Sequence, residues 1–152
     1  MPIWIIILLP AVPALMMGVS DFRDRSVSVI YFIVFGCCCL FSSAISSCLE
    51  DVAFRFAVNI VMLLIFYLAL KLYFRLNGQK NAQIIDRAFG AGDALFLVCS
   101  GLLFDAVPLC MFISSSCIIG IAWGRICRNK EIPFIGLASP VLLVFLLIYN
   151  IF

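Results

Sequence analysis

Histidine is absent from the 152 residues of this chain, and charged residues make up only 12% of them. Without histidine, Ser-His and Cys-His catalysis are excluded, and the commonest protein ligand for zinc, copper or haem is missing. About a quarter of the residues in an average soluble domain are charged, so this chain has too little polar surface to coat a water-soluble globule. The net charge of +2, with no separate basic block, also argues against a nucleic-acid-binding protein.

Cysteine pairs with the spacing of a metal or redox motif are also missing. The chain has eight cysteines but no Cys-x-x-Cys spacing, and nearly all of them lie inside apolar runs. A thiol in such a run behaves as a small hydrophobic group. We therefore expect neither a disulfide framework nor a metal site, and nothing in the sequence calls for a cofactor.

Apolar runs make up most of the sequence, with 66% hydrophobic residues and a mean hydropathy of +1.25. One bilayer crossing needs about 20 such residues. Runs of this kind predict single membrane spans over residues 2–20, 27–49, 52–76 and 133–152. A further run over 94–124, interrupted by Asp105 and Pro108, is long for one span and short for two.

The distribution of basic residues decides between one and two crossings in that run. Two crossings put nine of the ten basic residues on one side and leave Arg55 near the other: Arg23, Arg25, Lys71, Arg75, Lys80, Arg87, Arg125, Arg128 and Lys130. The positive-inside rule makes that side cytoplasmic. The predicted fold is all-α, a single polytopic domain over residues 1–152 with about six transmembrane helices and both termini outside.

A carboxylate in or near a membrane costs free energy, so the position of each of the eight Asp and Glu residues calls for an explanation. Three fall at predicted outer turns and read as ordinary loop residues: Glu50, Asp51 and Asp105. Two more, Asp86 and Glu131, stand among basic residues and read as part of a solvated charge mixture.

Asp21 and Asp93 stand apart from these. Asp21 follows the first apolar run directly, and Asp93 opens the fourth, after two glycines, Gly90 and Gly92, that let the backbone bend sharply and approach other groups. Six crossings place both carboxylates at one depth on one side. If the two helices are neighbours, one carboxyl group keeps a proton while the other acts as a base, which would activate water without metal or histidine. The alternative is an ordinary loop residue at Asp21 and a helix cap at Asp93.

Three segments resemble the type IV prepilin peptidases, a family of membrane aspartyl proteases with a GxGD motif. Residues 90–93 (GAGD) match that motif, residues 21–27 (DFRDRSV) resemble the family's D-x-R-x-x-x-[IV] segment, and residues 131–138 (EIPFIGLA) resemble its K-x-I-P-F-G-P-x-L-A stretch. The resemblance implies that Asp21 and Asp93 are catalytic, with Asp24 as the rival for the first role. It also implies supporting roles for Gly90, Gly92, Pro133 and Gly136.

The same resemblance implies an aspartic endopeptidase of the bacterial or archaeal cytoplasmic membrane, with its active site on the cytoplasmic side. Its substrates would be prepilin-like membrane proteins of type IV pilus or protein secretion systems, cut after a short basic leader. The chain resembles the short form of the family, without the cytoplasmic segment that methylates the new terminus.

The chain departs from the family pattern at three positions, Ser28, Leu95 and Leu137, where a proline, a lysine and a proline are usual. Two other functions stay open at this point. One is a non-enzymatic membrane assembly subunit that keeps the fold. The other is a transporter that uses Asp21 and Asp93 as a carboxylate relay, for which both residues should lie near the midplane of the bilayer.

Overall fold

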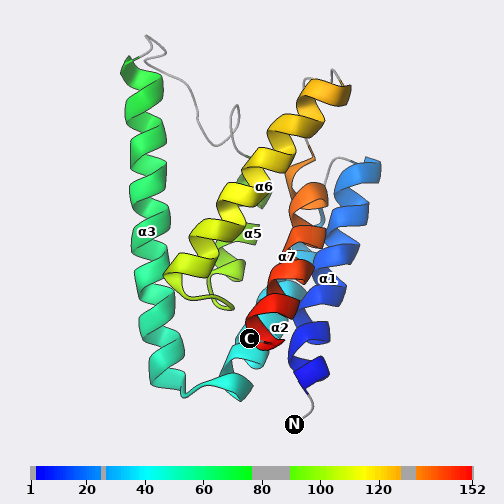
Figure 1. Ribbon diagram of the computed structural model, residues 1–152, viewed down its shortest axis with the longest axis vertical. Helices are drawn as coiled ribbons and strands as arrows, with labels where there is room; N and C mark the ends of the chain where they lie inside the picture. Colours follow the sequence, from blue (N-terminus) through cyan, green and yellow to red (C-terminus); the bar gives the residue numbers. More distant parts are fainter. Residues whose placement is uncertain (1–2, 25–26, 77–89, 128–132, 152) are drawn as a thin grey trace.

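The computed structural model describes residues 3–24, 27–76, 90–127 and 133–151, and these ranges fold into helices without a strand among them. The helices are α1 (Ile3–Asp24), α2 (Val29–Ser46), α3 (Leu49–Leu76), α5 (Ala91–Ser100), α6 (Ala106–Cys127) and α7 (Phe134–Ile151) (Figure 1). The predicted all-α fold is therefore confirmed.

Four of these helices, α1, α2, α3 and α6, are long and apolar enough to cross a bilayer. The run over 94–124 does form two helices, as the charge distribution predicts, with a turn over 101–105 between them. However, α5 has only 10 residues, which extend about 15 Å along the helix axis. That is about half the hydrocarbon core, so α5 does not reach across it as a full span would.

The most extensive helix contact joins α1 to α7, which run in opposite directions side by side (Figure 1). Gly18 of α1 faces Ser139 of α7 so closely that a Cβ atom at Gly18 would collide with the Ser139 side chain. The absence of a side chain at Gly18 therefore lets the two backbones approach. This contact brings the end of α1 next to the start of α7.

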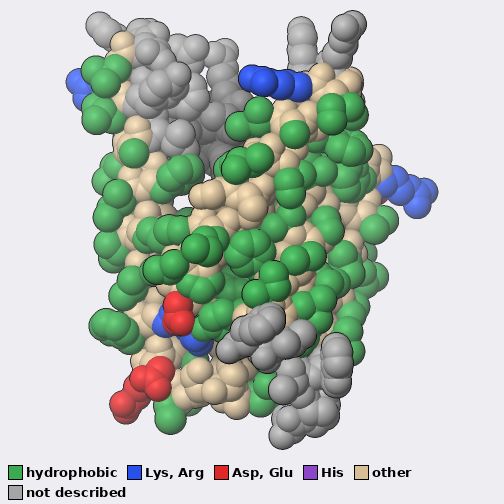
Figure 2. Space-filling model, viewed as in Figure 1, with side chains coloured by type: hydrophobic (Ala, Val, Ile, Leu, Met, Phe, Trp, Pro, Cys, Tyr) green, Lys and Arg blue, Asp and Glu red, His purple; other side chains and the backbone are tan. Residues whose placement is uncertain are grey.

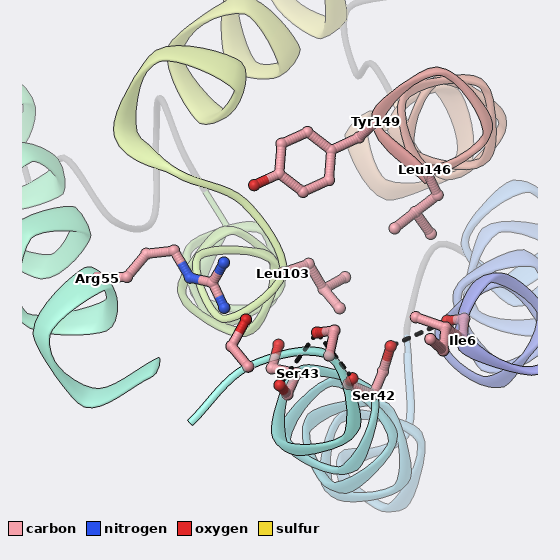
Figure 3. Close-up of a pocket in the computed structure, with 9 residues that line it drawn as sticks. Ile6, Ser42, Ser43, Arg55, Leu103, Leu146 and Tyr149 are labelled. Atoms are coloured by element: carbon pink, nitrogen blue, oxygen red, sulfur yellow. Dashed lines mark hydrogen bonds between the residues drawn. The ribbon is translucent and has the colours of Figure 1, made fainter. Parts of the chain in front are cut away.

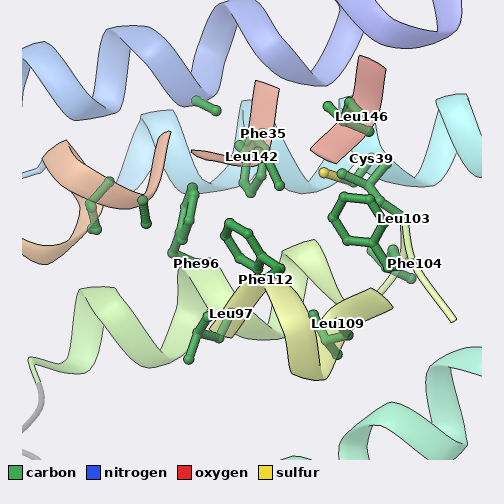
Figure 4. Close-up of a cluster of buried hydrophobic side chains, with 14 of the residues drawn as sticks. Phe35, Cys39, Phe96, Leu97, Leu103, Phe104, Leu109, Phe112, Leu142 and Leu146 are labelled. Atoms are coloured by element: carbon green, nitrogen blue, oxygen red, sulfur yellow. The ribbon is translucent and has the colours of Figure 1, made fainter. Parts of the chain in front are cut away.

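Aromatic rings fill the centre of the bundle and connect α2, α5, α6 and α7 (Figure 4). Phe35 and Phe96 stack with ring centroids 5.2 Å apart, and Phe112 packs against Phe96 at 6.4 Å and against Phe104 at 6.1 Å. All four of these side chains are fully buried. The short helix α5 is thus anchored from within by Phe96, although it covers only half the membrane.

Helix α3 differs from the others because it lies at the side of the bundle (Figure 1), and only 11% of its apolar window is buried. Most of its large apolar side chains are exposed. Such a surface would be unstable in water and is the expected surface towards lipid. Together with the four long apolar helices, it identifies a helical membrane protein.

Charged side chains occupy opposite ends of the bundle, with an apolar band between them (Figure 2). Four basic residues lie at or near the C-terminal ends of α1, α3 and α6, which point to the same end of the bundle: Arg23, Lys71, Arg75 and Arg125. Arg55 lies towards the other end. The remaining five basic residues of the predicted cytoplasmic side lie outside the described residues: Arg25, Lys80, Arg87, Arg128 and Lys130. Both termini lie at the end opposite to Arg23, as an even number of crossings requires (Figure 1).

Candidate active site

Asp21 lies in the last turn of α1, because the helix continues through the first part of the polar cluster instead of ending before it. Its half-buried carboxylate accepts a hydrogen bond from the backbone N–H of Gly136, with Oδ2 2.9 Å from the nitrogen. Gly136 is the third residue of α7, and the N–H groups of a helix's first turn have no acceptor within their own helix. Asp21 therefore caps α7 from a neighbouring helix.

Asp93 lies in the first turn of α5, at the helix start where the sequence predicts it. It is the third residue of that helix, and its Oδ2 accepts a hydrogen bond from the backbone N–H of Gly90, the N-cap residue, at 3.2 Å. The positive end of the helix dipole favours a carboxylate there. The capping role that the sequence leaves open for Asp93 is thus real, and it does not distinguish a structural from a catalytic residue.

The electrostatics of Asp93 connect it to Asp21. The pKa of Asp93 is raised from 3.8 to about 6, mainly by burial; the Gly90 N–H opposes this shift, and the negative charge of Asp21 contributes to it. In water at about 0.1 M salt, two charges interact appreciably over distances up to about 10 Å. The two carboxylates therefore lie close enough to influence each other's ionisation, and Asp93 holds its proton to a higher pH than an ordinary aspartate.

Two glycines of the motifs fit tightly between neighbouring side chains. A Cβ atom at Gly136 would lie 2.6 Å from the ring of Phe22, and one at Gly92 would lie 3.1 Å from Phe32 and 3.7 Å from Ile135. Both glycines therefore make room for close packing around the two carboxylates. Gly90 differs from the expectation, because its φ of −65° and ψ of 146° are open to any residue and no sharp bend depends on it.

Asp24, the rival for the first catalytic position, is exposed at the end of α1. Its carboxylate lies 3.9 Å from the guanidinium of the neighbouring Arg23, and both side chains are mostly in solvent. A pair of this kind contributes little to stability. The structure thus brings Asp21 and not Asp24 into the space where α1, α5 and α7 meet.

The three positions that depart from the family pattern have ordinary structural roles. Ser28 is the N-cap residue of α2, Leu95 is an exposed residue of α5, and Leu137 is buried in α7. The backbone N–H of Leu137 donates to the carbonyl of Pro133, a bond that a proline at this position could not make. Pro133 itself directly precedes α7, where its fixed φ suits a helix start.

The three sequence motifs converge at one end of the bundle. The Asp21–Gly136 hydrogen bond joins the first motif to the third, and Gly92 packs against Ile135, which joins the second to the third. Sequence reasoning did not foresee the backbone N–H of Gly136 as the partner of Asp21. No sequence signal reveals such a bond, since Asp21 and Gly136 are 115 residues apart in the chain.

Comparison with known protein families, curated proteins and solved structures found no match to this chain. The fold and the site together define a class, a polytopic helical membrane protein with two coupled carboxylates at one end. The resemblance to one family noted in the sequence rests on the three motifs alone, and the structure brings these motifs together.

Proposed function

We propose that the protein is a membrane aspartyl endopeptidase of the prepilin peptidase type, with Asp21 and Asp93 as the catalytic pair. One observation carries the proposal: the only three segments that resemble the family are far apart in sequence and meet around these two carboxylates. Two facing carboxylates that share one proton are the arrangement by which aspartic proteases activate water.

The surroundings of the two aspartates suggest separate roles. Asp93 has the raised pKa, so it is the group that holds the proton. Asp21, which accepts the Gly136 N–H, is the ionised partner. In this scheme Asp21 takes a proton from a water molecule whose oxygen attacks the scissile carbonyl carbon, and Asp93 donates its proton to the carbonyl oxygen. The tetrahedral intermediate then collapses: the C–N bond breaks, the leaving amine takes the proton held by Asp21, and one hydroxyl of the intermediate returns its proton to Asp93 as the new carboxyl group forms.

The position of the site favours substrates that are themselves membrane proteins. Asp21 and Asp93 lie at helix ends, at the end of the bundle that carries Arg23 and Arg125. A substrate whose apolar helix lies in the bilayer would present the junction between leader and helix at this depth. An anionic leaflet would also attract a basic leader by about 1 kcal/mol per Lys or Arg.

The packing around Gly92 predicts that the substrate has a small residue directly before the cleaved bond. Phe32 and Ile135 already approach this backbone closely, so little space remains beside Asp93. The proposed setting is the cytoplasmic face of a bacterial or archaeal inner membrane, with prepilin-like proteins as substrates.

The test is cleavage of model substrates by the purified protein in lipid vesicles. Asp21→Asn and Asp93→Asn should each abolish cleavage, because an amide can neither share the proton nor act as a base. The matched control is Asp24→Asn, which should stay active because Asp24 is exposed and its partner among the described residues is Arg23. A substrate without its apolar helix, or with a bulky residue before the cut, should not be cleaved.

Two results would contradict the proposal. Cleavage by both asparagine variants at the wild-type rate would exclude the dyad, and an inactive wild-type protein across the substrate panel would favour an assembly subunit. The location of the carboxylates at helix ends already weighs against a relay transporter, whose carboxylates should line a path through the midplane.

A further inference from the structure

The two aspartates of the proposed site are held at the starts of two different helices. Asp93 belongs to the first turn of α5, and Asp21 is bound by the backbone N–H of Gly136 in the first turn of α7. The separation of the two carboxylates therefore depends on the distance between these two helix starts. Any side chain that packs where the starts meet helps to set that distance.

Phe32 of α2 borders the start of α5. A Cβ atom at Gly92 would lie 3.1 Å from the ring of Phe32, so the ring occupies the place that a side chain at position 92 would take. One turn further along both helices, Phe35 stacks on Phe96 with ring centroids 5.2 Å apart. These two contacts fix how closely α2 and α5 approach, and the first of them lies directly beside Asp93.

The start of α7 borders the same point. A Cβ atom at Gly92 would lie 3.7 Å from the side chain of Ile135, which directly precedes Gly136, the residue that binds Asp21. Phe32 is 8% exposed and Ile135 is 2% exposed. Both apolar side chains are therefore packed where the two helix starts meet.

The opposite end of the bundle shows what such apolar packing prevents. A cavity of about 280 Å³ there is lined in part by the hydroxyl groups of Ser46 and Tyr149 (Figure 3). A polar cavity of this size has room for several water molecules. Beside Gly92, by contrast, Phe32 and Ile135 are packed close to the backbone, so bulk water has little access to this side of the proposed site.

We propose that Phe32 is a positioning residue of the site: its ring fixes the separation of the two helix starts and keeps bulk water from the space between the two carboxylates. Charges interact more strongly where water is excluded, so the ring strengthens the coupling between Asp21 and Asp93. The expected effect of Phe32 on cleavage rests on the proposed function, whereas its effect on the coupling does not.

Titration of Asp93, followed by its carboxyl carbon shift, measures this coupling without any substrate. Among the described residues, Asp21 and the Gly90 N–H act on the pKa of Asp93 in addition to burial. The measured quantity is the fall in this pKa when Asp21→Asn is introduced. In Phe32→Ala, water should enter the vacated space and screen the two charges, so the same change should lower the pKa by at most about half as much as it does in wild type.

Phe35→Ala is the matched control, because it truncates a second buried ring of α2, one that packs against α5 away from the helix starts. Both alanine variants should lower the Tm, but only Phe32→Ala should weaken the coupling. If an alanine variant does not fold, Phe32→Leu and Phe35→Leu form the matched pair, and the expected difference between them is smaller and has the same direction.

Cleavage of a model substrate in lipid vesicles gives the second readout. Phe32→Leu should lower kcat by about tenfold to a hundredfold with KM nearly unchanged, because the alignment of the carboxylates changes whereas a small residue before the cut still fits. Phe35→Leu should leave kcat unchanged.

Two results of the titration would overturn the proposal: full coupling in the Phe32 variant, or an equal loss of coupling in the Phe35 variant. A wild-type protein that cleaves no substrate, but whose coupling is weakened by Phe32→Ala, would contradict the proposed function and support the positioning role of Phe32.

Discussion

The polar groups at the two ends of the bundle are arranged in opposite ways. At the end with the termini, donors meet acceptors: Asn59 donates to the carbonyls of Gly101 and Phe104, and Tyr149 donates to Asp105. At the other end two groups of like charge, Asp21 and Asp93, lie within electrostatic reach of each other. The first arrangement stabilises the fold, whereas the second costs stability.

This difference supports the end at which we propose that the function lies. Buried polar groups that satisfy one another are what a stable fold requires, and they need no further reason. Two carboxylates within electrostatic reach of each other at helix ends oppose each other's ionisation, and shifted pKa values of this kind are most common at functional sites. The end with the termini therefore has mainly paired polar groups, although Nε and Nη2 of Arg55 and Oδ1 of Asn59 have no hydrogen-bond partner among the described residues. The other end carries the two carboxylates of the proposed site.

The largest effect on stability is expected at the end with the termini. Asn59 is fully buried and holds the turn after α5 through two carbonyls, at 2.8 and 2.7 Å. Asn59→Ala leaves both carbonyls without a donor and should lower the free energy of unfolding by about 2–4 kcal/mol. Ser43→Ala, which removes one bond to the same turn, should cost about 1 kcal/mol. The comparison would break if equilibrium unfolding in detergent ranked the two variants in the opposite order.

A smaller effect, on activity, is expected from Gly136→Ala. The added methyl group would lie 2.6 Å from the ring of Phe22, which packs edge-on against Trp123. The helix start should shift away from Asp21, and cleavage should fall by about tenfold to a hundredfold. Phe22→Ala in the same chain removes the clash and should restore most of the rate. If the double variant is as slow as Gly136→Ala, packing against Phe22 is not the cause.

The smallest effect is a change in stability with pH at Asp93. Its pKa in the folded protein, about 6, exceeds the ordinary 3.8, so folding favours the protonated form and stability falls as the pH rises between these values. Asn at this position is uncharged at every pH and can still accept the Gly90 N–H. Asp93→Asn should therefore be more stable than wild type at about pH 8, by about 1–2 kcal/mol after screening by solvent, and equal to it at about pH 4.

Thermal unfolding of both proteins across this range measures the effect. Asp24→Asn is the control, because its exposed carboxylate should give a pH profile parallel to that of wild type. A constant offset between Asp93→Asn and wild type at all pH values would show that Asp93 has an ordinary pKa.

Much of the fold follows from the sequence because a helix that crosses a bilayer needs about 20 apolar residues. Apolar runs of span length predict the long helices, and the basic residues predict the turn after α5, although no local signal separates α5 from α6 apart from Asp105 and Pro108. The shortness of α5 was not predictable, because it depends on Asn59 of α3 binding the backbone of the turn. Periodicity and composition contain no information about such contacts between helices.

The candidate site was predictable in its residues and not in its contacts. Asp21 and Asp93 stand out because carboxylates at the ends of apolar runs are uncommon, and the motifs add Gly136. That Asp21 binds the backbone of α7, and that Arg55 pairs with Asp105 instead of its neighbours Glu50 and Asp51, depends on packing over long sequence distances.

The central claim is that Asp21 and Asp93 form one coupled pair, and titration of Asp93 tests it most directly. Carboxyl carbon shifts of ¹³C-labelled aspartate, assigned through Asp93→Asn, should give a pKa of about 6 for Asp93 in wild type. Asp21→Asn removes the neighbouring charge, so the pKa of Asp93 should fall while it stays above 3.8, because burial remains. Asp24→Asn should leave it unchanged. An Asp93 pKa that is the same in wild type and Asp21→Asn would contradict the account.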